Sequence, residues 1–563
     1  MTHAMTRQRV DWDVVIAGAG PAGLTLANHL GALGIRTLVL EALPQLIDYP
    51  RGVGMDDETL RSFQAVGLVD TVRQHTVPDQ IMGFLNRHRQ TLISIMPPGQ
   101  PFGWPRRNGF IQPLVDRVLL QGLGRFAQVQ VRTQCRVEGF TDAADAVTVQ
   151  VQPVDADGEA AGNRWTTTAR YLVGCDGGRS PIRGAMGLPF EGISESTRWL
   201  VIDLADDPVG TPNVNLVLRN DFPYVEIALP HGIRRFEFMV PRGADEADFA
   251  RPERVQELLA RVLPAEVKPK VLRHRVYMHH ARIVPDFRKG RVFLAGDAAH
   301  LMPVWQGQGF NTGIRDATNL AWKLALVVQG AAGDRLLDTY TQERHAHASA
   351  MIDLSVLVGR IFVPSHTVLR ALRDVLAPVL FRFEALRRYI GEMRFKPMPF
   401  FQTGAVVHRG APDPKGVVGK MLIQPWVTDA AGQARRLDDV IGLRFAIVSW
   451  SVGADAWITP AGRAVLARLG AVPVVVRPAC QDLQRGVPEG TLAVADRDGT
   501  VKRWFDQAPG SIVLLRPDRI VAAVCTGWEL DETLRALSAT MDLAPDNATQ
   551  APVPHAQQEE ALT

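Results

Sequence analysis

The segment Asp13–Glu41 constrains the fold of this chain more than any other part of the sequence. An apolar run at Val14–Ala17 leads into the glycine-rich hexapeptide GAGPAG at residues 18–23. A pattern of apolar residues at helical spacing follows, and a second apolar run ends at Glu41. This order predicts a strand, a helix and a second parallel strand, which is the βαβ unit that carries dinucleotide fingerprints.

Each glycine of the hexapeptide has its own physical reason. Gly18 allows a tight turn after the strand, Gly20 lets the backbone approach a pyrophosphate, and Gly23 lets the helix pack closely on the strand. Glu41 follows Gly23 by 18 residues, close to the spacing expected of an acid that binds a ribose hydroxyl. The segment therefore predicts an adenine-dinucleotide site, with NAD and FAD both open, and the alternative is an ordinary glycine-rich turn.

Length and charge bound the remaining possibilities. A chain of 563 residues is expected to form two or three domains. Its 62 Lys and Arg nearly balance its 59 Asp and Glu, so charge favours neither nucleic acid nor a membrane surface as a partner. The four cysteines are far apart with no CxxC pair, which disfavours a disulfide framework, a metal site and a redox dithiol. No run of 18 apolar residues occurs and the first residues form no apolar leader, so we expect a cytoplasmic protein.

Two later motifs favour FAD over NAD. Asp176 begins a D-G-x-x-S-x-x-R pattern after an apolar strand. Further along, a short apolar strand ends at Gly296-Asp297, and Gly309 opens a long helix. Asp297 is placed to accept a hydrogen bond from a ribityl hydroxyl, and the helix N-terminus is placed to stabilise the negative charge of a reduced flavin. The alternative here is an N-cap aspartate followed by a glycine-rich loop.

The three motifs in this order resemble those of the group A flavin monooxygenases, the p-hydroxybenzoate hydroxylase-like aromatic hydroxylases, over about the first 395 residues. IDYPRGVGMDDETLRS, FGWPRRNGFIQP, ALPHGIRRFEFMV, GDAAHLMPVWQGQGFN and EMRFKPMP are similar to the branch that hydroxylates 3-(3-hydroxyphenyl)propionate and 3-hydroxycinnamate. The resemblance implies an α/β chain with a p-hydroxybenzoate hydroxylase-like FAD-binding fold, in which an antiparallel substrate sheet is inserted into a Rossmann-type βαβ domain. It also implies a thioredoxin-like C-terminal domain.

The implied activity is monooxygenation of a phenolic acid, with tightly bound FAD and NAD(P)H as a transient reductant. NADH is favoured over NADPH, and O2 supplies the oxygen through a C4a-hydroperoxyflavin. The product is the 2,3-dihydroxy catechol, an intermediate of phenylpropanoid degradation. A homodimer is expected. The residues assigned to the cofactor are Gly18, Ala19, Gly20, Pro21, Ala22, Gly23, Glu41, Arg51, Gln112, Asp176, Gly296, Asp297, Pro303, Gly307, Gly309 and Asn311.

The catalytic residues are not settled by the resemblance. Related phenol hydroxylases carry an active-site Asp where this chain has Val53, and here the acids follow at Asp56 and Asp57. The candidates for catalysis are Asp56, Tyr224 and His280, and Phe238 and His279 are further candidates for contact with the substrate. A bidentate arginine is expected to bind the carboxylate, from among Arg106, Arg107, Arg234 and Arg235. For each of these residues a structural role is the alternative.

The chain divides by pattern into three parts. Residues 1–395 form the predicted FAD-binding domain, with the substrate sheet at about 190–290 and a helical segment at about 340–395. Residues 396–543 form the predicted thioredoxin-like domain, which lacks CxxC and serves packing or dimer contacts. Residues 544–563 are rich in Ala, Pro and Gln and are predicted to be a disordered tail.

Other functions remain open at this point. The same fold serves flavin enzymes that act on a different phenol or on a polyketide-like aromatic, and flavin halogenases and epoxidases. The halogenase option is weakened because no WxWxIP run is present. A non-catalytic FAD-fold binding protein is the alternative outside enzymes, and the presence of all three FAD motifs argues against it.

Overall fold

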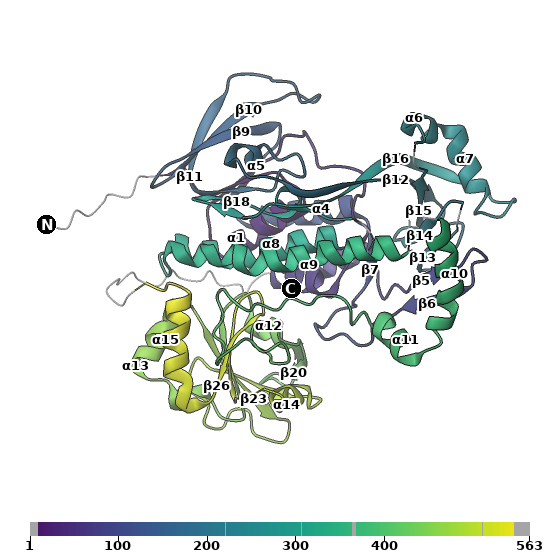
Figure 1. Ribbon diagram of the computed structural model, residues 1–563. Coiled ribbons are helices and arrows are strands. Elements are labelled where there is room, and N and C mark those ends of the chain that lie inside the picture. Colours follow the sequence, from purple (N-terminus) through teal and green to yellow (C-terminus); the bar gives the residue numbers. More distant parts are fainter. Residues whose placement is uncertain are drawn as a thin grey trace.

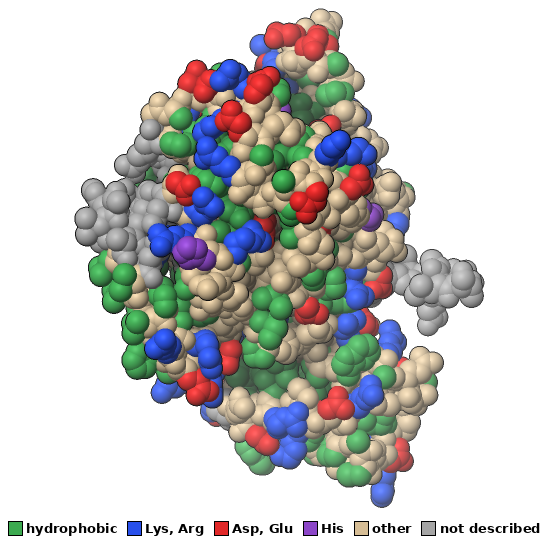
Figure 2. Space-filling view, turned by 90° about the vertical axis from the view of Figure 1, so that its right-hand side faces the viewer, with side chains coloured by type: hydrophobic (Ala, Val, Ile, Leu, Met, Phe, Trp, Pro, Cys, Tyr) green, Lys and Arg blue, Asp and Glu red, His purple; other side chains and the backbone are tan. Residues whose placement is uncertain are grey.

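The computed structural model describes residues 10–544 except 220, 242, 304, 306, 363–366 and 509. The predicted tail therefore lies outside the described residues from position 545 onward. The first sheet of the N-terminal body lies above the long helices α8 and α9, the second sheet extends from above them to their right-hand end, and the C-terminal domain lies below them (Figure 1). Figure 2 shows Lys and Arg side chains interspersed with Asp and Glu over the face that it draws, as the near-balanced composition predicts.

The first sheet is built on the fingerprint strand. β1 pairs in parallel with β2 on one side and with β11 on the other, and β11 pairs in parallel with β18. Period-two alternation from Val129 to about Leu172 predicts an antiparallel insertion in this domain. Strands β9 and β10 confirm it by extending β11 as an antiparallel meander, whereas β8 at the start of the segment pairs in parallel with β2. The strand order is β17-β18-β11-β1-β2-β8. The strands are β1 Trp12–Ala17, β2 Thr37–Leu40, β8 Val129–Arg132, β9 Cys135–Asp142, β10 Val147–Pro153, β11 Trp165–Gly174, β17 Arg288–Lys289 and β18 Val292–Leu294.

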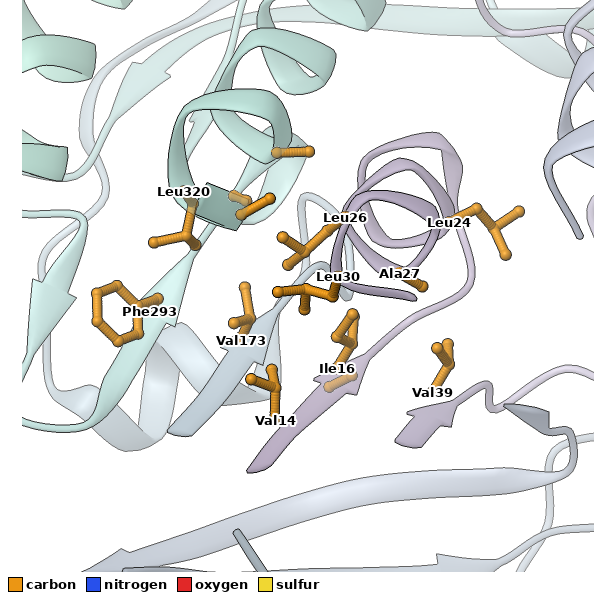
Figure 3. Packing of buried hydrophobic residues seen from close by; sticks show 14 of the residues in the cluster. Val14, Ile16, Leu24, Leu26, Ala27, Leu30, Val39, Val173, Phe293 and Leu320 are labelled. Carbon is orange, nitrogen blue, oxygen red and sulfur yellow. The ribbon is translucent and has the colours of Figure 1, made fainter. Parts of the chain in front are cut away.

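Helices α1 (Pro21–Ala32) and α8 (Gln308–Val328) pack on this sheet and on each other. Figure 3 shows Leu26 and Leu30 of α1 between the strand residues Ile16 and Val173 and the side of α8 that carries Leu320. The close approach needs glycine, since a Cβ on Gly313 would lie 3.1 Å from the Cα of Gly296. Buried apolar area of this kind contributes roughly 25 cal/mol per Å² to folding, and it fixes the N-termini of both helices relative to the strand ends.

The second sheet is antiparallel apart from one pair and has the order β19-β16-β12-β15-β14-β13-β5-β6. Period-two alternation at Tyr224–Val240 around His231-Gly232 predicts a hairpin. Strands β14 and β15 confirm it, with His231 and Gly232 at φ values of 60° and 70° as a tight primed turn requires. Strands β5 and β6 come from residues 82–95 and were not predicted to join this sheet. The strands are β5 Met82–Leu85, β6 Thr91–Ile95, β12 Glu191–Ala205, β13 Val214–Val217, β14 Tyr224–Leu229, β15 Ile233–Val240, β16 Lys270–Ile283 and β19 His300–Leu301.

A small three-stranded sheet and several helices complete the N-terminal body. The sheet has the order β3-β7-β4 and lies beside the N-terminus of α2. Helices α9, α10 and α11 occupy the segment predicted to be helical between about 340 and 395. The elements are β3 Gly54–Met55, β4 Thr76–Val77, β7 Asn108–Phe110, α2 Asp57–Ala65, α3 Val69–Arg73, α4 Gln112–Gly122, α5 Pro181–Met186, α6 Glu246–Phe249, α7 Pro252–Ala260, α9 Thr339–Phe362, α10 Thr367–Leu380 and α11 Glu384–Gly391.

The C-terminal domain contains a seven-stranded sheet in the order β21-β20-β24-β23-β22-β25-β26. Apolar runs at Arg444–Trp450 and Val472–Val476, with a helical run at Gly462–Leu469 between them, predict a strand–helix–strand unit. The centre of the sheet confirms it, because β22 and β23 are parallel and α13 connects them, with antiparallel β25 and β26 on the other side. The thioredoxin-like assignment itself stays a prediction. The elements are β20 Trp426–Thr428, β21 Ala434–Arg436, α12 Leu437–Ile441, β22 Ala446–Trp450, α13 Pro460–Arg468, β23 Val472–Pro478, β24 Leu492–Asp496, α14 Thr500–Phe505, β25 Ile512–Leu515, β26 Val521–Cys525 and α15 Leu530–Thr540.

Among the residues that the structure describes, no helix is both long enough and apolar enough to cross a membrane.

Candidate active site

A cavity of about 310 Å³ lies where the fingerprint turn, the N-terminus of α2, the second sheet and the N-terminus of α8 meet. Apolar and aromatic side chains form most of its wall, and a few charged groups point into it, which is the usual make-up of a site for an aromatic ligand. The residues that line the cavity include Gly20, Arg51, Asp56, Asp57, Arg106, Arg107, Gln112, Trp199, Val225, Glu237, Asp297, Trp305, Gly307, Gly309, Met393 and Lys396.

The three fingerprint glycines differ in the way predicted. Gly18 has φ of +102°, and a Cβ there would lie 2.4 Å from the carbonyl oxygen of Cys175. A Cβ on Gly23 would lie 2.2 Å from the carbonyl oxygen of Gly18, so this position also excludes a side chain. A Cβ on Gly20 would meet no atom within 4 Å, because this residue faces the cavity. The open cradle at Gly20 fits the backbone approach that a pyrophosphate needs.

Two helix N-termini face this cavity. Helix α1 begins after Gly20 and helix α8 begins after Gly307, and neither N-cap residue has a side chain that accepts from the first-turn N–H groups. These unpaired donors and the positive end of each helix dipole favour an anion. The α1 end suits a diphosphate and the α8 end suits the anionic ring of a reduced flavin.

Glu41 organises the fingerprint turn from the end of β2. Its Oε2 atom accepts a hydrogen bond of 2.7 Å from the backbone N–H of Ala19, and its Oε1 atom accepts one of 2.9 Å from that of Leu43. The side chain is therefore oriented by backbone donors. Its contact with a ribose hydroxyl stays a prediction.

Gln112 is the first residue of α4 and braces the loop that carries Arg51. Its Oε1 atom accepts from the N–H of Gly52 at 2.8 Å, and its Nε2 atom donates to Asp116 at 3.2 Å. Burial raises the pKa of Asp116 to about 7. Gln112 thus has a structural task in addition to its place on the cavity wall, whereas the exposed Arg51 side chain has no such partner recorded among the described residues.

The D-G-x-x-S-x-x-R block fixes the short helix α5 beside the end of β11. Asp176 accepts from the N–H of Ile182 at 3.1 Å, while its Oδ1 atom is buried and has no partner in the described structure. Burial raises the pKa of Asp176. Arg183 donates to the carbonyls of Ala298 and Gly178 at 3.0 and 2.8 Å. Asp176 lies between the lining residues Cys175 and Gly177 and does not itself line the cavity, so its contact with a cofactor stays a prediction.

The remaining assigned residues surround the N-terminus of α8. Asp297, Gly296, Gly307 and Gly309 line the cavity, and the buried Pro303 follows the lining residue Met302. Asn311 is a brace, since its Nδ2 atom donates to the carbonyls of Gly54 and Gly307 and its Oδ1 atom accepts from the N–H of Asp56.

The N-terminus of α2 carries three consecutive buried acids opposite two buried cations. Asp56 caps the helix by accepting from the N–H of Thr59 at 3.1 Å, and it also pairs with Arg315 and, at 3.0 Å, with Lys396. Glu58 pairs with Arg315 at 2.7 Å and with Lys396 at 3.8 Å. Despite burial, these cations hold the pKa of Asp56 well below its usual range. Both oxygens of Asp56 are therefore committed to structural partners.

Asp57 is the third acid of this group and behaves differently. One of its oxygens accepts from the N–H of Glu58 at 3.2 Å, and no cation lies within 4 Å of it in the described part of the chain. Burial and the neighbouring charge of Asp56 raise its pKa to about 7. Asp57 lines the cavity.

This chain is similar to known proteins over most of its length. A family model described as FAD binding domain matches residues 11–355, and a second, described as HcaD C-terminal domain, matches residues 419–540. A 3-(3-hydroxy-phenyl)propionate/3-hydroxycinnamic acid hydroxylase of Mycolicibacterium gilvum is 49% identical over 96% of this chain and 93% of its own length. The protein of the same name in Paraburkholderia xenovorans is 44% identical, over 96% of this chain and 92% of its own.

This chain belongs to the FAD-dependent aromatic hydroxylases. The crystal structure of the flavin-dependent monooxygenase PieE in complex with FAD and substrate superposes on it with a TM-score of 0.78. The match covers 95% of this chain and 100% of the other, at 21% identity, and it shows that the fold is shared. The predicted fold class and the predicted FAD cofactor are thereby confirmed.

In this hydroxylase two of the candidates from the second sheet lie on the face opposite the cavity. Tyr224 is paired across the strands with Phe238, and both pack in the apolar cluster under α6 and α7. The Tyr224 hydroxyl accepts a hydrogen bond of 2.6 Å from Arg89. The cavity face is formed by the alternate residues Val225 and Glu237. Alternation along the strand was predicted, but the set of residues that faces the cavity was not.

The two histidine candidates lie on β16, away from the cavity wall of the hydroxylase. His280 is paired in register with Ser194 on β12 and does not line the cavity. His279 is buried and stacks on Trp199, with ring centroids 6.1 Å apart, and burial lowers its pKa to about 4. A neutral His279 therefore supports the indole that lines the cavity and does not itself reach it.

The four arginine candidates separate into two pairs. Arg234 is bound to Asp207 at 2.8 Å and Arg235 to Asp203 at 2.7 Å, so both are held by acids of neighbouring segments. Arg106 and Arg107 both line the cavity. Burial lowers the pKa of Arg107 to about 10, its Nε atom has no partner, and its recorded side-chain contact is the sulfur of Met393 at 3.9 Å.

Three charged residues on the cavity wall or in its ion pairs are not among the residues predicted from the sequence. Lys396 and Arg315 reach the acids of α2 from segments more than 250 residues away, and Glu237 was passed over beside the aromatic residues of its strand. The EMRFKPMP segment was recognised as similar to relatives, and its lysine was the signal available for Lys396.

Proposed function

We propose that this chain is a FAD- and NAD(P)H-dependent monooxygenase that hydroxylates a phenolic acid ortho to its hydroxyl group, with 3-(3-hydroxyphenyl)propionate and 3-hydroxycinnamate as substrates. In the balanced reaction the phenolic acid, O2, NAD(P)H and a proton give the 2,3-dihydroxy acid, NAD(P)+ and water. FAD, when bound, supplies the redox chemistry that links the reductant to O2. The protein's own task is to hold the ring, the carboxylate and the phenol hydroxyl of the substrate in a fixed orientation and to exclude water from the site.

The observation that carries this proposal is the unpaired Arg107 on the wall of an otherwise largely apolar cavity. Arg107 is half-buried, its Nε atom is shielded from water, and no acid pairs with it among the described residues. Such a guanidinium is costly to desolvate, and a ligand carboxylate satisfies it with charge-assisted hydrogen bonds. Arg106 is adjacent and half-buried, so it is available as a second donor. Trp199, Val225 and Trp305 supply the apolar surface that an aromatic ring requires. The names of the relatives that are 44% and 49% identical agree with this substrate class.

For the cofactor we assign the phosphates to the turn around Gly20 and the α1 N-terminus. The isoalloxazine is assigned to the segment between Pro303 and Gly309, beside the α8 N-terminus. Asp297 is assigned to the ribityl chain, and Gly20→Val is expected to abolish retention of FAD because the side chain fills the open cradle. The flavin absorbance of the purified variant measures this directly.

A screen of reductant consumption tests the function. The purified protein is expected to be yellow and to oxidise NADH faster with 3-(3-hydroxyphenyl)propionate or 3-hydroxycinnamate, with one catechol formed for each NADH consumed. Phenol, 4-hydroxybenzoate and a polyketide aromatic serve as competitors. Equal or better coupled turnover of 4-hydroxybenzoate or of the polyketide would overturn the proposed substrate class, and a colourless protein without stimulated oxidation would overturn the monooxygenase proposal.

Three further points belong to the same proposal. We propose NADH as the preferred reductant, which the ratio of kcat/KM for NADH and NADPH tests. A homodimer is proposed as the oligomeric state, and light scattering of the holoenzyme tests it. Cytoplasmic location is proposed for the chain, and fractionation of the producing cells tests that.

A further inference from the structure

The N-terminus of α2 holds more negative charge than its buried partners neutralise. Asp56, Asp57 and Glu58 are each less than 5% exposed. Arg315 from α8 and Lys396 from the segment after α11 provide two positive charges, and both are bound to Asp56 and Glu58. Two acids and two cations thus form a closed set, and Asp57 is the surplus acid.

The surplus acid is also the one that is fixed beside the proposed flavin end of the cavity. Asn311 of α8 donates to the carbonyls of Gly54 and Gly307 and accepts from the N–H of Asp56. A Cβ on Gly54 would lie 3.8 Å from the Cα of Gly307, so the strand before α2 runs against the N-terminus of α8. These contacts hold the first turn of α2, and with it Asp57, on the wall of the cavity.

The other acids on the cavity wall are less suited to receive a proton from a phenol. Asp56 is committed to its two cations. Glu237 faces the cavity from β15 and has Arg235 of its own strand at 3.8 Å. Asp297 follows the strand end where the ribityl chain is assigned. Glu237 is therefore the one competitor that needs an experimental control.

We propose, on the basis of the proposed function, that Asp57 is the catalytic base that takes the proton from the substrate's phenol. The O–H bond of the phenol breaks, its electron pair stays on the phenol oxygen, and the proton forms a new O–H bond on the Asp57 carboxylate. The phenolate pushes electron density to the ortho carbon, where the new C–O bond forms to one atom of O2. The O–O bond breaks in the same step, NAD(P)H supplies the two electrons, and the second oxygen atom leaves as water. The ring then loses the ortho hydrogen as a proton, and the oxygen that gave up its proton recovers one from Asp57.

The surroundings of Asp57 set its working range. Asp56 and Glu58 disfavour its ionised form, while Lys396 and Arg106 favour it. Behind these groups lie Arg315, Arg344 and the buried His347, whose pKa is held well below its usual range by burial and by these cations. Arg107 and Glu237 line the same cavity. Together with burial, these charges place the pKa of the Asp57 carboxyl near neutral pH, the range in which a general base is most effective.

The test compares Asp57→Asn with the wild-type holoenzyme over a range of pH. Asn has the same shape and cannot take a proton. At pH 7 we expect catechol formation to fall roughly 10²–10⁴-fold, with FAD content unchanged. Above pH 8 the variant is expected to recover about tenfold per pH unit, because a free phenol ionises near pH 10. Asp70→Asn, at an exposed acid of α3, is the matched control and is expected to behave as wild type.

The outcomes separate the two proposals. Wild-type protein that makes no catechol from any phenolic acid would overturn the proposed function and the base together. Two results with an active wild-type protein would overturn only the assignment of Asp57 as the base. The first is a rate of catechol formation by Asp57→Asn within threefold of the wild-type rate at pH 7. The second is a loss of that rate which high pH does not relieve, in a variant that retains FAD. If Asp57→Asn fails to bind FAD, Asp57→Glu is used, which keeps the carboxylate and is expected to retain the acid limb of the pH profile. Loss of that limb in Glu237→Gln and not in the Asp57 variants would assign the proton transfer to Glu237.

Discussion

Two of the buried ion-pair clusters that meet helix α8 differ in charge balance and in surroundings. The first is the cavity cluster, made of Asp56, Asp57 and Glu58 with Arg315 and Lys396. The second is the interface cluster, made of Glu343 and Asp518 with Lys323 and Arg516, which are the residues where α8 and α9 meet the C-terminal domain. Both clusters are almost fully shielded from water.

The interface cluster is balanced and saturated. Arg516 binds both oxygens of Glu343 at 2.8 Å and also pairs with Asp518, and Lys323 binds Glu343 at 2.8 Å. Arg516 and Lys323 lower the pKa of Glu343 to about 2, and burial lowers that of Lys323 to about 8. Two negative and two positive charges leave nothing for a ligand, so this cluster ties the C-terminal domain to the N-terminal body.

The cavity cluster is unbalanced and opens on the site. Asp57 has no cation of its own, and Arg107 on the same cavity has no acid of its own. We infer from this comparison that buried charges without a full set of partners serve the reaction in this fold. Buried charges that are fully paired hold the domains together. Burial or a shifted pKa alone does not separate the two.

The largest effect on stability is expected from Glu343→Gln. The substitution leaves Lys323 and Arg516 buried without their shared acid, and breaking such a pair costs about 3–5 kcal/mol. The free energy of unfolding, measured by urea titration at pH 7, reports the loss, with the exposed Glu532→Gln as control. A loss below about 1 kcal/mol would contradict a structural role for the interface cluster.

Arg107→Met is expected to act on substrate binding. Removing the charged donor raises KM for 3-(3-hydroxyphenyl)propionate roughly 10–100-fold, since a charged hydrogen bond contributes about 1.5–3 kcal/mol. The matched substrate 3-ethylphenol lacks the carboxylate, so its KM is expected to stay unchanged. Equal effects on both substrates would remove Arg107 from the carboxylate site.

Asp57→Asn is expected to stabilise the fold at alkaline pH. The pKa of Asp57 is raised from 3.8 to about 7, so its favourable contribution is complete below pH 3.8 and is lost as the pH rises through about 7. The variant lacks this loss, and at pH 8 its free energy of unfolding is expected to exceed that of wild type by up to about 4 kcal/mol, because one pKa unit corresponds to about 1.4 kcal/mol.

The interface cluster has the opposite pH dependence. The pKa of Glu343 is lowered from 4.5 to about 2, so its contribution is present above pH 4.5 and is lost as the pH falls through about 2. Unfolding curves at pH 3, 5 and 8 for wild type and both variants measure the two slopes. Parallel slopes would show that the two clusters do not differ as described.

The smallest effect is expected from Lys396→Met on the pH profile of catechol formation. Lys396 favours the ionised form of Asp57, so its removal raises the pKa of Asp57 and moves the acid limb upward by about 1 pH unit. The initial rate of catechol formation between pH 5 and 9 gives the midpoint. A downward shift would contradict the charge count of the cavity cluster.

The sequence predicted what depends on neighbouring residues. The fingerprint turn, the hairpin at His231-Gly232 and helix α8 follow from local spacing and turn chemistry, and all are present. Period-two alternation located β14 and β15, but it does not say which alternate set faces a ligand, and Tyr224 and Phe238 were chosen where Val225 and Glu237 face the cavity.

The charge pairing could not be predicted in this way. Arg235 forms an ion pair with Asp203 because β12 and β15 place the two residues opposite each other. Lys396 pairs with Asp56, although the two residues are 340 positions apart in the sequence. The surplus acid becomes visible only after every buried partner has been counted in three dimensions. For the same reason Asp56, which follows the loop arginine, was a candidate from sequence, and its neighbour Asp57 is the better one in the structure.

The most direct test of the proposed reaction uses isotopic oxygen. The holoenzyme is mixed with NADH and 3-(3-hydroxyphenyl)propionate under 18O2, and the product is identified by mass and NMR spectra. We predict 3-(2,3-dihydroxyphenyl)propionate with one 18O atom at ring carbon 2, formed in a ratio near one to the NADH consumed. Consumption of NADH with hydrogen peroxide in place of the catechol, or a catechol without 18O, would contradict the account.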